Sequence, residues 1–244
     1  MLSQEINAKR VKAYIDRFVA ASHKSIYVII DGDRTLIPTD STKFFLEHLN
    51  LEYTDIKNIF KQHGYSFDAF YNAALYYSKI ETKRYNIACA ESANHVKIYP
   101  EFLSFINTIK DKVQLVLITS GISKSWQNII NNHSLEYIHL IAGNYFPADS
   151  FVIDKQAKGI VAKAIKEANK KVFAFGDTMI DFEMLKAADH SYLVVNEKQN
   201  RDFIPFANEI SHLKQVSFSN YFHSDIPTTN LKEIEEQILA LQQW

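Results

Sequence analysis

The stretch Ile26-Tyr27-Val28-Ile29-Ile30-Asp31-Gly32-Asp33-Arg34-Thr35 joins a β-branched apolar run to a pair of acids. The run is too short for a helix and is apolar on both faces, which indicates a central strand of a parallel sheet. Similar apolar runs recur, with helical patterns between them, at residues 115–118, 172–175 and 192–195. This alternation predicts an α/β fold, a Rossmann-like parallel sheet flanked by helices.

The segment between the first two predicted strands is longer than a crossover requires. From Leu36 to Val96 it holds no long β-branched run, and its aromatic residues fall near helical intervals. One alternative is a large helical layer of the same core. We favour a helical cap of residues 37–96 inserted after the first strand, because loops at the carboxyl ends of parallel strands commonly carry insertions that build a site. Residues 1–36 and 97–244 would then form the core domain.

Composition narrows the function classes. The 244 residues include 27 Lys or Arg and 28 Asp or Glu, a formal net charge of −1, so we expect no nucleic-acid partner. A single cysteine, Cys89, excludes an internal disulfide and a cysteine-based zinc site. No apolar stretch approaches the roughly 20 residues of a membrane span, and basic residues interrupt the N-terminal region where a signal peptide would need an apolar block. We expect a cytoplasmic protein, and the sequence leaves its oligomeric state open.

Acidic residues gather at the ends of the predicted strands. Asp31 and Asp33 cannot both stay ionised in a dry pocket without a counter-charge, because their repulsion raises a pKa. A divalent cation supplies that charge, and oxygen ligands suit Mg²⁺. Asp177 and Asp181 add carboxylates after another strand, although Asp177 or Thr178 alone could instead cap the helix that follows. Acids at several strand ends together favour a metal site.

A hydroxyl and a lysine complete the candidate site. Ser120 can cap the helix that holds Trp126, or it can hydrogen-bond a phosphate oxygen. A serine nucleophile is not expected, because the chain lacks a Gly-x-Ser-x-Gly elbow. Lys158 can be a solvated lysine at a helix start, or it can place its charge against the carboxylates and an anionic substrate.

These residues resemble the motifs of the haloacid dehalogenase-like hydrolases. The four motifs stand in order at 31–36 (Asp-x-Asp-x-Thr-Leu), 117–121 (Leu-Ile-Thr-Ser-Gly), 157–159 (Ala-Lys-Gly) and 176–184 (Gly-Asp-Thr-x-x-Asp-x-x-Met). The first motif alone is a weak signal, whereas four in order are specific. The Ser-Gly and Lys-Gly pairs, with a helical cap between the first two motifs, are similar to the phosphoserine phosphatase-like branch.

The resemblance implies a role for each residue. Asp31 would be the nucleophile that forms an aspartyl-phosphate, and Asp33 would be the general acid and then the base. Mg²⁺ would bind the carboxylates of Asp31 and Asp177 and the backbone carbonyl of Asp33. The phosphoryl group would be held by Ser120, Gly121 and Lys158, with support from Thr35 and Asp181.

The function that the resemblance implies is Mg²⁺-dependent hydrolysis of a phosphate monoester, with a small phosphorylated metabolite as the substrate. A phosphomutase or phosphotransferase on the same core is one alternative. A non-catalytic binding protein of the same fold is another, and the intact set of acids, serine and lysine weighs against it.

Three positions near the site depart from the phosphoserine phosphatase pattern. Asp40 stands nine residues after Asp31, where those enzymes carry a glutamate that meets the substrate amine. It is one methylene shorter, and it can equally be the N-cap of the next helix. Arg84 is the one arginine of the predicted cap, with no secure match to the family's cap arginine. The sequence gives no role for Arg34 or for residues 200–230.

Overall fold

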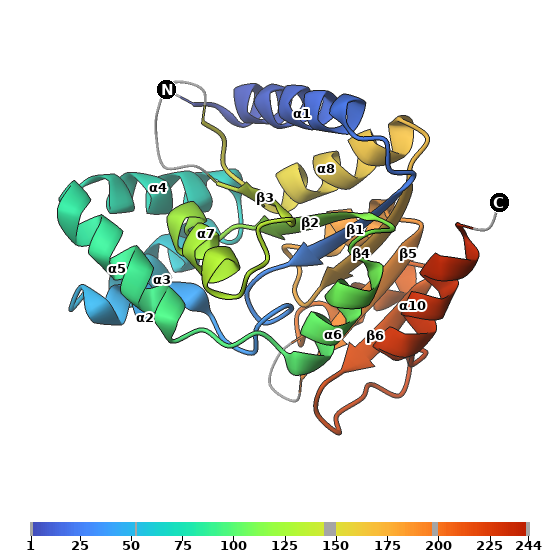
Figure 1. Ribbon diagram of the computed structural model, residues 1–244. Helices are drawn as coiled ribbons and strands as arrows, with labels where there is room; N and C mark the ends of the chain where they lie inside the picture. The colour runs from blue at the N-terminus through green and yellow to red at the C-terminus, as the bar shows by residue number, and fades with distance from the viewer. Residues whose placement is uncertain (1, 52, 144–149, 197–199, 243–244) are drawn as a thin grey trace.

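The computed structural model describes residues 2–51, 53–143, 150–196 and 200–242. It contains a six-stranded parallel sheet of order β3-β2-β1-β4-β5-β6, with helices on both faces (Figure 1). The strands are β1 (Ile26–Asp31), β2 (Gln114–Thr119), β3 (His139–Ala142), β4 (Lys171–Gly176), β5 (His190–Val195) and β6 (Leu213–Ser217). The predicted α/β fold with a parallel sheet is confirmed.

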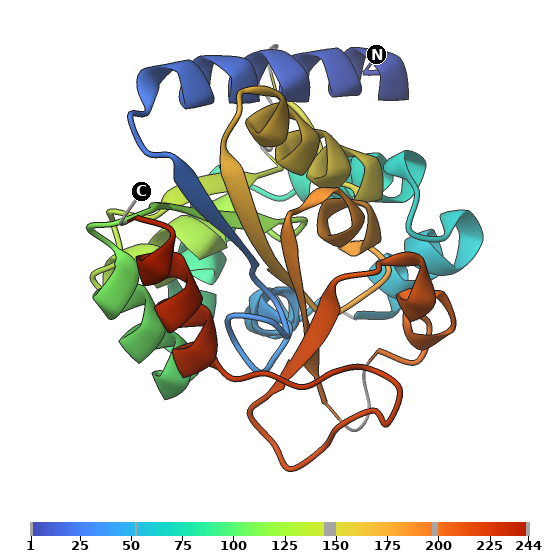
Figure 2. The same ribbon diagram turned by 90° about the vertical axis from the view of Figure 1, so that its right-hand side faces the viewer.

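Each face of the sheet buries its own apolar layer, as β1 illustrates. Tyr27 and Ile29 belong to one core cluster, and Val28 and Ile30 belong to the other. The first face is covered by α1 (Gln4–Ala21), α8 (Lys155–Glu167) and α9 (Phe182–Ala187). The second is covered by α6 (Pro100–Ile109), α7 (Ser123–Asn132) and α10 (Leu231–Ala240). Figure 2 shows α1 and α8 on one side of the strands and α6 and α10 on the other. Burial on both faces explains the continuous apolar runs.

A helical insertion follows β1, as predicted. It contains α2 (Ser41–His48), α3 (Tyr53–His63), α4 (Phe67–Ser78) and α5 (Thr82–Asn94), which lie together beside α7 at one end of the molecule (Figure 1). These helices share a separate apolar cluster that includes Phe45 and Cys89. The next helix, α6, packs against the sheet through Phe102 and Phe105 and therefore lies in the core layer. None of the described helices is long and apolar enough to cross a membrane.

Two strands of the sheet were not predicted from the sequence. Both β3 and β6 are edge strands with a single neighbour. His139 and Leu140 in β3 are partly exposed, and Lys214 in β6 is exposed, so neither strand carries a run of fully buried residues. A short 3₁₀ helix (Ile204–Glu209) precedes β6. Edge strands need less apolar sequence than central ones, which explains the omission.

Candidate active site

The carboxyl ends of the central strands meet in one place. The chain runs from β1 outward to β3 and then returns to β4 on the other side of β1, so the strand order reverses between β1 and β4. Such a reversal leaves a crevice outside the strand ends. Asp31 ends β1, Ser120 follows β2 and Asp177 follows β4. The fold therefore brings these three predicted residues to the same crevice.

Lys158 is the buried cation of this crevice. Its side chain is 2% exposed, and its Nζ donates hydrogen bonds to Asp31 and, at 2.6 Å, to Oδ1 of Asp181. Lys158 lies in the first turn of α8, which begins at Lys155, but its side chain is buried, so the alternative of a solvated lysine is wrong. Burial works to lower the pKa of Lys158, but the charges of Asp181 and Asp31 outweigh it and raise this pKa.

Asp181 links the lysine to the loop after β4. Its Oδ2 accepts hydrogen bonds from the backbone N–H groups of Asp177 and Thr178, both at 3.1 Å. The next helix, α9, starts at Phe182, so a capping role for Asp177 or Thr178 is wrong. Asp181 therefore orients both Lys158 and the backbone that carries Asp177.

Arg34 acquires a role that its sequence position did not reveal. It adopts a left-handed backbone conformation with φ of 63°, which is uncommon outside glycine and asparagine. Its Nε lies 3.1 Å from Oδ2 of Asp177, and its Nη1 lies 3.5 Å from Oδ2 of Asp40. The guanidinium thus joins the crevice to the first residues of the helical insertion and partly neutralises Asp177.

The carboxylates of the crevice form a group suited to a metal ion. Asp31, Asp177 and Asp181 are buried, and each offers an oxygen that lies within 4.8 Å of the others. Burial, followed by the charge of Asp181, raises the pKa of Asp31 to about 6. Burial also raises the pKa of Asp177 well above its ordinary value. Mg²⁺ prefers such hard oxygen ligands, and its charge would offset this repulsion. The residues present therefore fit a metal ion; ligation by the Asp33 carbonyl stays a prediction.

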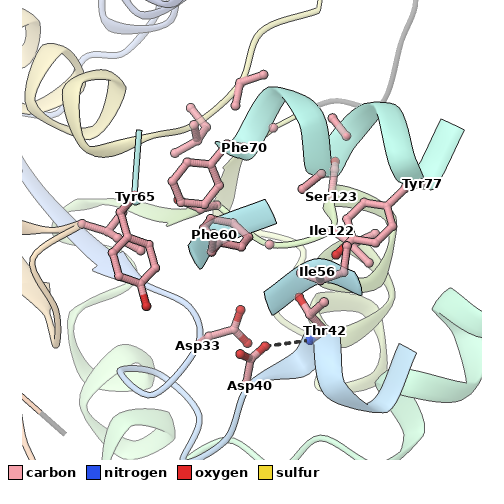
Figure 3. Close-up of a pocket in the computed structure, with 18 of the residues that line it drawn as sticks. Asp33, Asp40, Thr42, Ile56, Phe60, Tyr65, Phe70, Tyr77, Ile122 and Ser123 are labelled. Atoms are coloured by element: carbon pink, nitrogen blue, oxygen red, sulfur yellow. Dashed lines mark hydrogen bonds between the residues drawn. The ribbon is translucent and has the colours of Figure 1, made fainter. Parts of the chain in front are cut away.

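Asp33 faces the cavity that adjoins the crevice. Its Oδ1 accepts a hydrogen bond from the backbone N–H of Ser41 at 2.6 Å, and it lines the cavity beneath the helical insertion (Figure 3). Burial, followed by the nearby charge of Asp40, raises the pKa of Asp33 to about 7. A carboxyl group with a pKa near neutrality can both give and take a proton, which is the property of a general acid–base.

Ser120 lines the same cavity as Asp33. Its Oγ is buried and has no hydrogen-bond partner among the described residues. The predicted alternative, that it caps the following helix, is wrong, since α7 begins at Ser123 and its N-cap position is Ile122. A buried hydroxyl without a partner normally requires one, which a ligand oxygen would supply. The neighbouring Gly121 gives its N–H to Oγ1 of Thr119 at 2.9 Å.

The remaining predicted residues are Thr35, Asp40 and Arg84. Thr35 Oγ1 lies 3.5 Å from Oδ1 of Asp177, a supporting position. Asp40 caps α2, its Oδ1 accepting from the backbone N–H of Thr42 at 3.1 Å, and it also lines the cavity. Capping and a substrate contact are thus compatible, and the contact stays a prediction. Arg84 instead donates to a backbone carbonyl of the insertion at 3.3 Å and is not among the residues that line this cavity.

Two residues that shape the crevice were missed by sequence reasoning. Asn200 donates to the backbone carbonyl of Asp177 at 2.6 Å and to that of Val194 at 3.0 Å, so it fixes the loop after β4. Trp126 packs on Gly32, where a Cβ atom would lie 2.4 Å from the indole ring. A glycine between the two acids is the one local signal of such a close approach.

Comparison with known proteins agrees with this geometry. A family model described as haloacid dehalogenase-like hydrolase matches residues 28–186. No curated protein matches the chain. Among solved structures, a substrate-bound phosphoserine phosphatase complex is 15% identical with a TM-score of 0.57, covering 88% of this chain and 99% of that one. A phospho-aspartyl intermediate analogue of phosphoserine phosphatase is 15% identical with a TM-score of 0.52 and the same coverage. A HAD family hydrolase from Salmonella enterica subsp. enterica serovar Typhi is 14% identical with a TM-score of 0.52, covering 89% of this chain and 77% of that one. At such identities these structures establish similarity of fold.

Proposed function

As the chain belongs to the haloacid dehalogenase-like hydrolases, we propose that it is a Mg²⁺-dependent phosphatase that hydrolyses a small phosphate monoester through an aspartyl-phosphate. The observation that carries this proposal is the contrast between two neighbouring acids. Asp31 is buried and paired with Lys158, whereas Asp33 faces the cavity and accepts a hydrogen bond from the backbone N–H of Ser41. Two carboxyl groups in such different environments suit one nucleophile and one acid–base group.

The proposed reaction has two steps. A carboxylate oxygen of Asp31 forms a bond to phosphorus, the bond to the leaving oxygen breaks, and Asp33 gives that oxygen its proton. Asp33 then takes a proton from water, whose oxygen attacks phosphorus and breaks the bond to Asp31. Lys158 and Ser120 hold the phosphoryl oxygens. A Mg²⁺ ion held by Asp31 and Asp177 would offset charge between nucleophile and phosphate.

The fold neighbours support the same class of substrate by analogy. Two of them are phosphoserine phosphatase structures, one with substrate and one with an analogue of a phospho-aspartyl intermediate. Because fold alone does not decide function, the weight rests on the residues of the crevice. A small phosphorylated metabolite as partner and a cytoplasmic location belong to this proposal.

Phosphate release tests the proposal. The protein is incubated with a panel of small phosphate esters, with Mg²⁺ and again after exhaustive chelation, and inorganic phosphate is measured. We expect release that chelation abolishes and Mg²⁺ restores. The matched variant Asp31→Asn changes almost no volume but removes the attacking charge, so it should release none while staying folded. Full release after chelation, or by Asp31→Asn, would overturn the proposal.

A further inference from the structure

The reaction crevice opens into a large cavity of about 480 Å³. Asp33 and Ser120 line this cavity together with nine residues of the helices α3, α4 and α5. Cavities of roughly 300–1,000 Å³ normally hold ligands well above the size of a single amino acid. The volume available to the leaving group is therefore greater than phosphoserine needs.

The wall opposite the acids is mainly apolar. Figure 3 shows Phe60 and Phe70 to one side of the cavity and Ile56, Ile122 and Tyr77 to the other, with the carboxylates below. Further apolar and aromatic residues of the lining are Tyr65, Ala73, Ala74, Tyr85, Val152, Ile153 and Ile180, and the hydroxyls of Thr42 and Ser123 add polar groups. A charged group gains little binding free energy from contact with an apolar wall. An apolar ligand binds such a wall favourably, because its apolar surface is removed from water.

The polar groups of the cavity suit the phosphate end of a substrate better than an amino acid. Asp40 is held by Arg34 and by the N-terminus of α2, so an ammonium group would have to compete for it. Arg84, the cap's arginine, bonds a backbone carbonyl and does not line the cavity. Because Asp40 is already paired with Arg34, placing the ammonium group of phosphoserine there carries a desolvation cost that an apolar leaving group avoids.

Two lysines also line the cavity, and attraction of the phosphate group accounts for their charge. Lys57 and Lys61 project from α3 and are exposed. Positive charge at the mouth of a cleft attracts an anion from solution and speeds its entry. A phosphate dianion alone accounts for them, so they require no second anionic group in the substrate.

We propose, building on the phosphatase function above, that the substrates are phosphate monoesters of apolar alcohols. The phosphate lies at Asp33 and Ser120, and the alkyl chain or ring of the leaving group fills the cavity between Phe60, Phe70 and Ile122. Phosphorylated amino acids are poor substrates.

A homologous series of alkyl phosphates tests this inference. Methyl, butyl and hexyl phosphate differ in apolar length and little in the chemistry of the leaving oxygen. We expect kcat/KM to rise about fourfold per added methylene until the cavity is full, with phosphoserine below hexyl phosphate. A flat series, or a preference for phosphoserine, overturns the inference and leaves the phosphatase function standing. If no ester is hydrolysed although the protein binds a hexyl compound that cannot be hydrolysed, the phosphatase function fails instead.

Binding without turnover separates those outcomes. Methylphosphonate and hexylphosphonate, which cannot be hydrolysed, are titrated calorimetrically into the protein with Mg²⁺, and hexylphosphonate should bind at least tenfold more tightly. Phe60→Ala removes part of the apolar wall and should reduce that ratio severalfold. The control Ile87→Ala alters a residue of α5 that is 46% exposed and lies outside the cavity, so it should keep the ratio.

A second variant guards against misfolding of the first. Ala74 is half-buried on α4 and lines the cavity, and Ala74→Glu places a charge in the space assigned to the alkyl chain. It should also reduce the hexyl-to-methyl ratio, with thermal unfolding used to confirm that both variants are folded. An unchanged ratio in a folded Phe60→Ala or Ala74→Glu protein refutes the assignment of this cavity.

Discussion

Replacing Lys158 with methionine tests how the crevice is held together. The substitution keeps a long unbranched side chain but removes the ammonium that lies between Asp31 and Asp181, 2.6 Å from the latter. The lysine is 2% exposed, so water cannot solvate the two carboxylates in place of the lost ammonium group. Removing one partner of a buried ion pair typically costs about 3–5 kcal/mol. We expect the metal-free variant to lose about that much free energy of unfolding at pH 7.

The control and the pH dependence sharpen this prediction. Lys163→Met alters an exposed lysine of the same helix and should cost no more than about 0.5 kcal/mol. The Lys158→Met loss should shrink between pH 7 and pH 5, because Asp31, whose pKa burial raises to about 6, takes up a proton in this range and then needs no counter-charge. Urea unfolding with chelator, followed by tryptophan fluorescence at pH 7 and pH 5, measures both. Equal losses for the two variants at pH 7 would refute the buried ion pair.

Three further predictions address other parts of the structure. Gly32→Ala forces a Cβ atom to within 2.4 Å of Trp126 and should lower the free energy of unfolding by about 1–3 kcal/mol in urea titration; an unchanged value contradicts that packing. Mg²⁺ at about 100 times its Kd should raise the free energy of unfolding, measured by calorimetry, by about 2.7 kcal/mol. Asp177→Asn should lose most of this gain, and an equal gain in the variant contradicts the metal site. Burial lowers the pKa of His139 below 6.5, so the folded protein favours its neutral form and loses stability as the pH falls through 6.5. His139→Phe should therefore flatten the decline of the melting temperature on the acid side. An unaltered pH profile contradicts this role of His139.

The parts of the fold that the sequence predicted are those buried on both sides. The central strands are continuous apolar runs because helices cover both faces; Asp31 ends β1, and Asp177 directly follows β4. The edge strands β3 and β6 carry partly exposed residues, and their composition alone does not distinguish them from loops. Burial pattern thus decided which strands were found.

The site was predictable where a residue's role follows from its place at a strand end. Arg34 was not, because its partner Asp177 is 143 positions away and the pairing depends on β1 lying beside β4. The same holds for Asn200, which bonds the backbone of Asp177 across 23 positions. Helix capping and ligand binding also looked alike for Ser120 until the start of α7 was known. The apolar cavity depends on how the helices of the insertion pack against one another, and the hydrophobic periodicity of the sequence does not predict that packing.

The most direct test of the central claim is whether Asp31 becomes phosphorylated. Asp33→Asn removes the proposed acid–base group, whose loss typically costs about 10²–10⁴-fold in rate. With an activated phosphate ester, whose leaving group needs little protonation, the first step should proceed and the second should stall. Intact-mass and peptide analysis of that variant should then find one phosphoryl group, on the peptide that contains Asp31. No adduct, or an adduct elsewhere in the chain, would contradict the proposed mechanism.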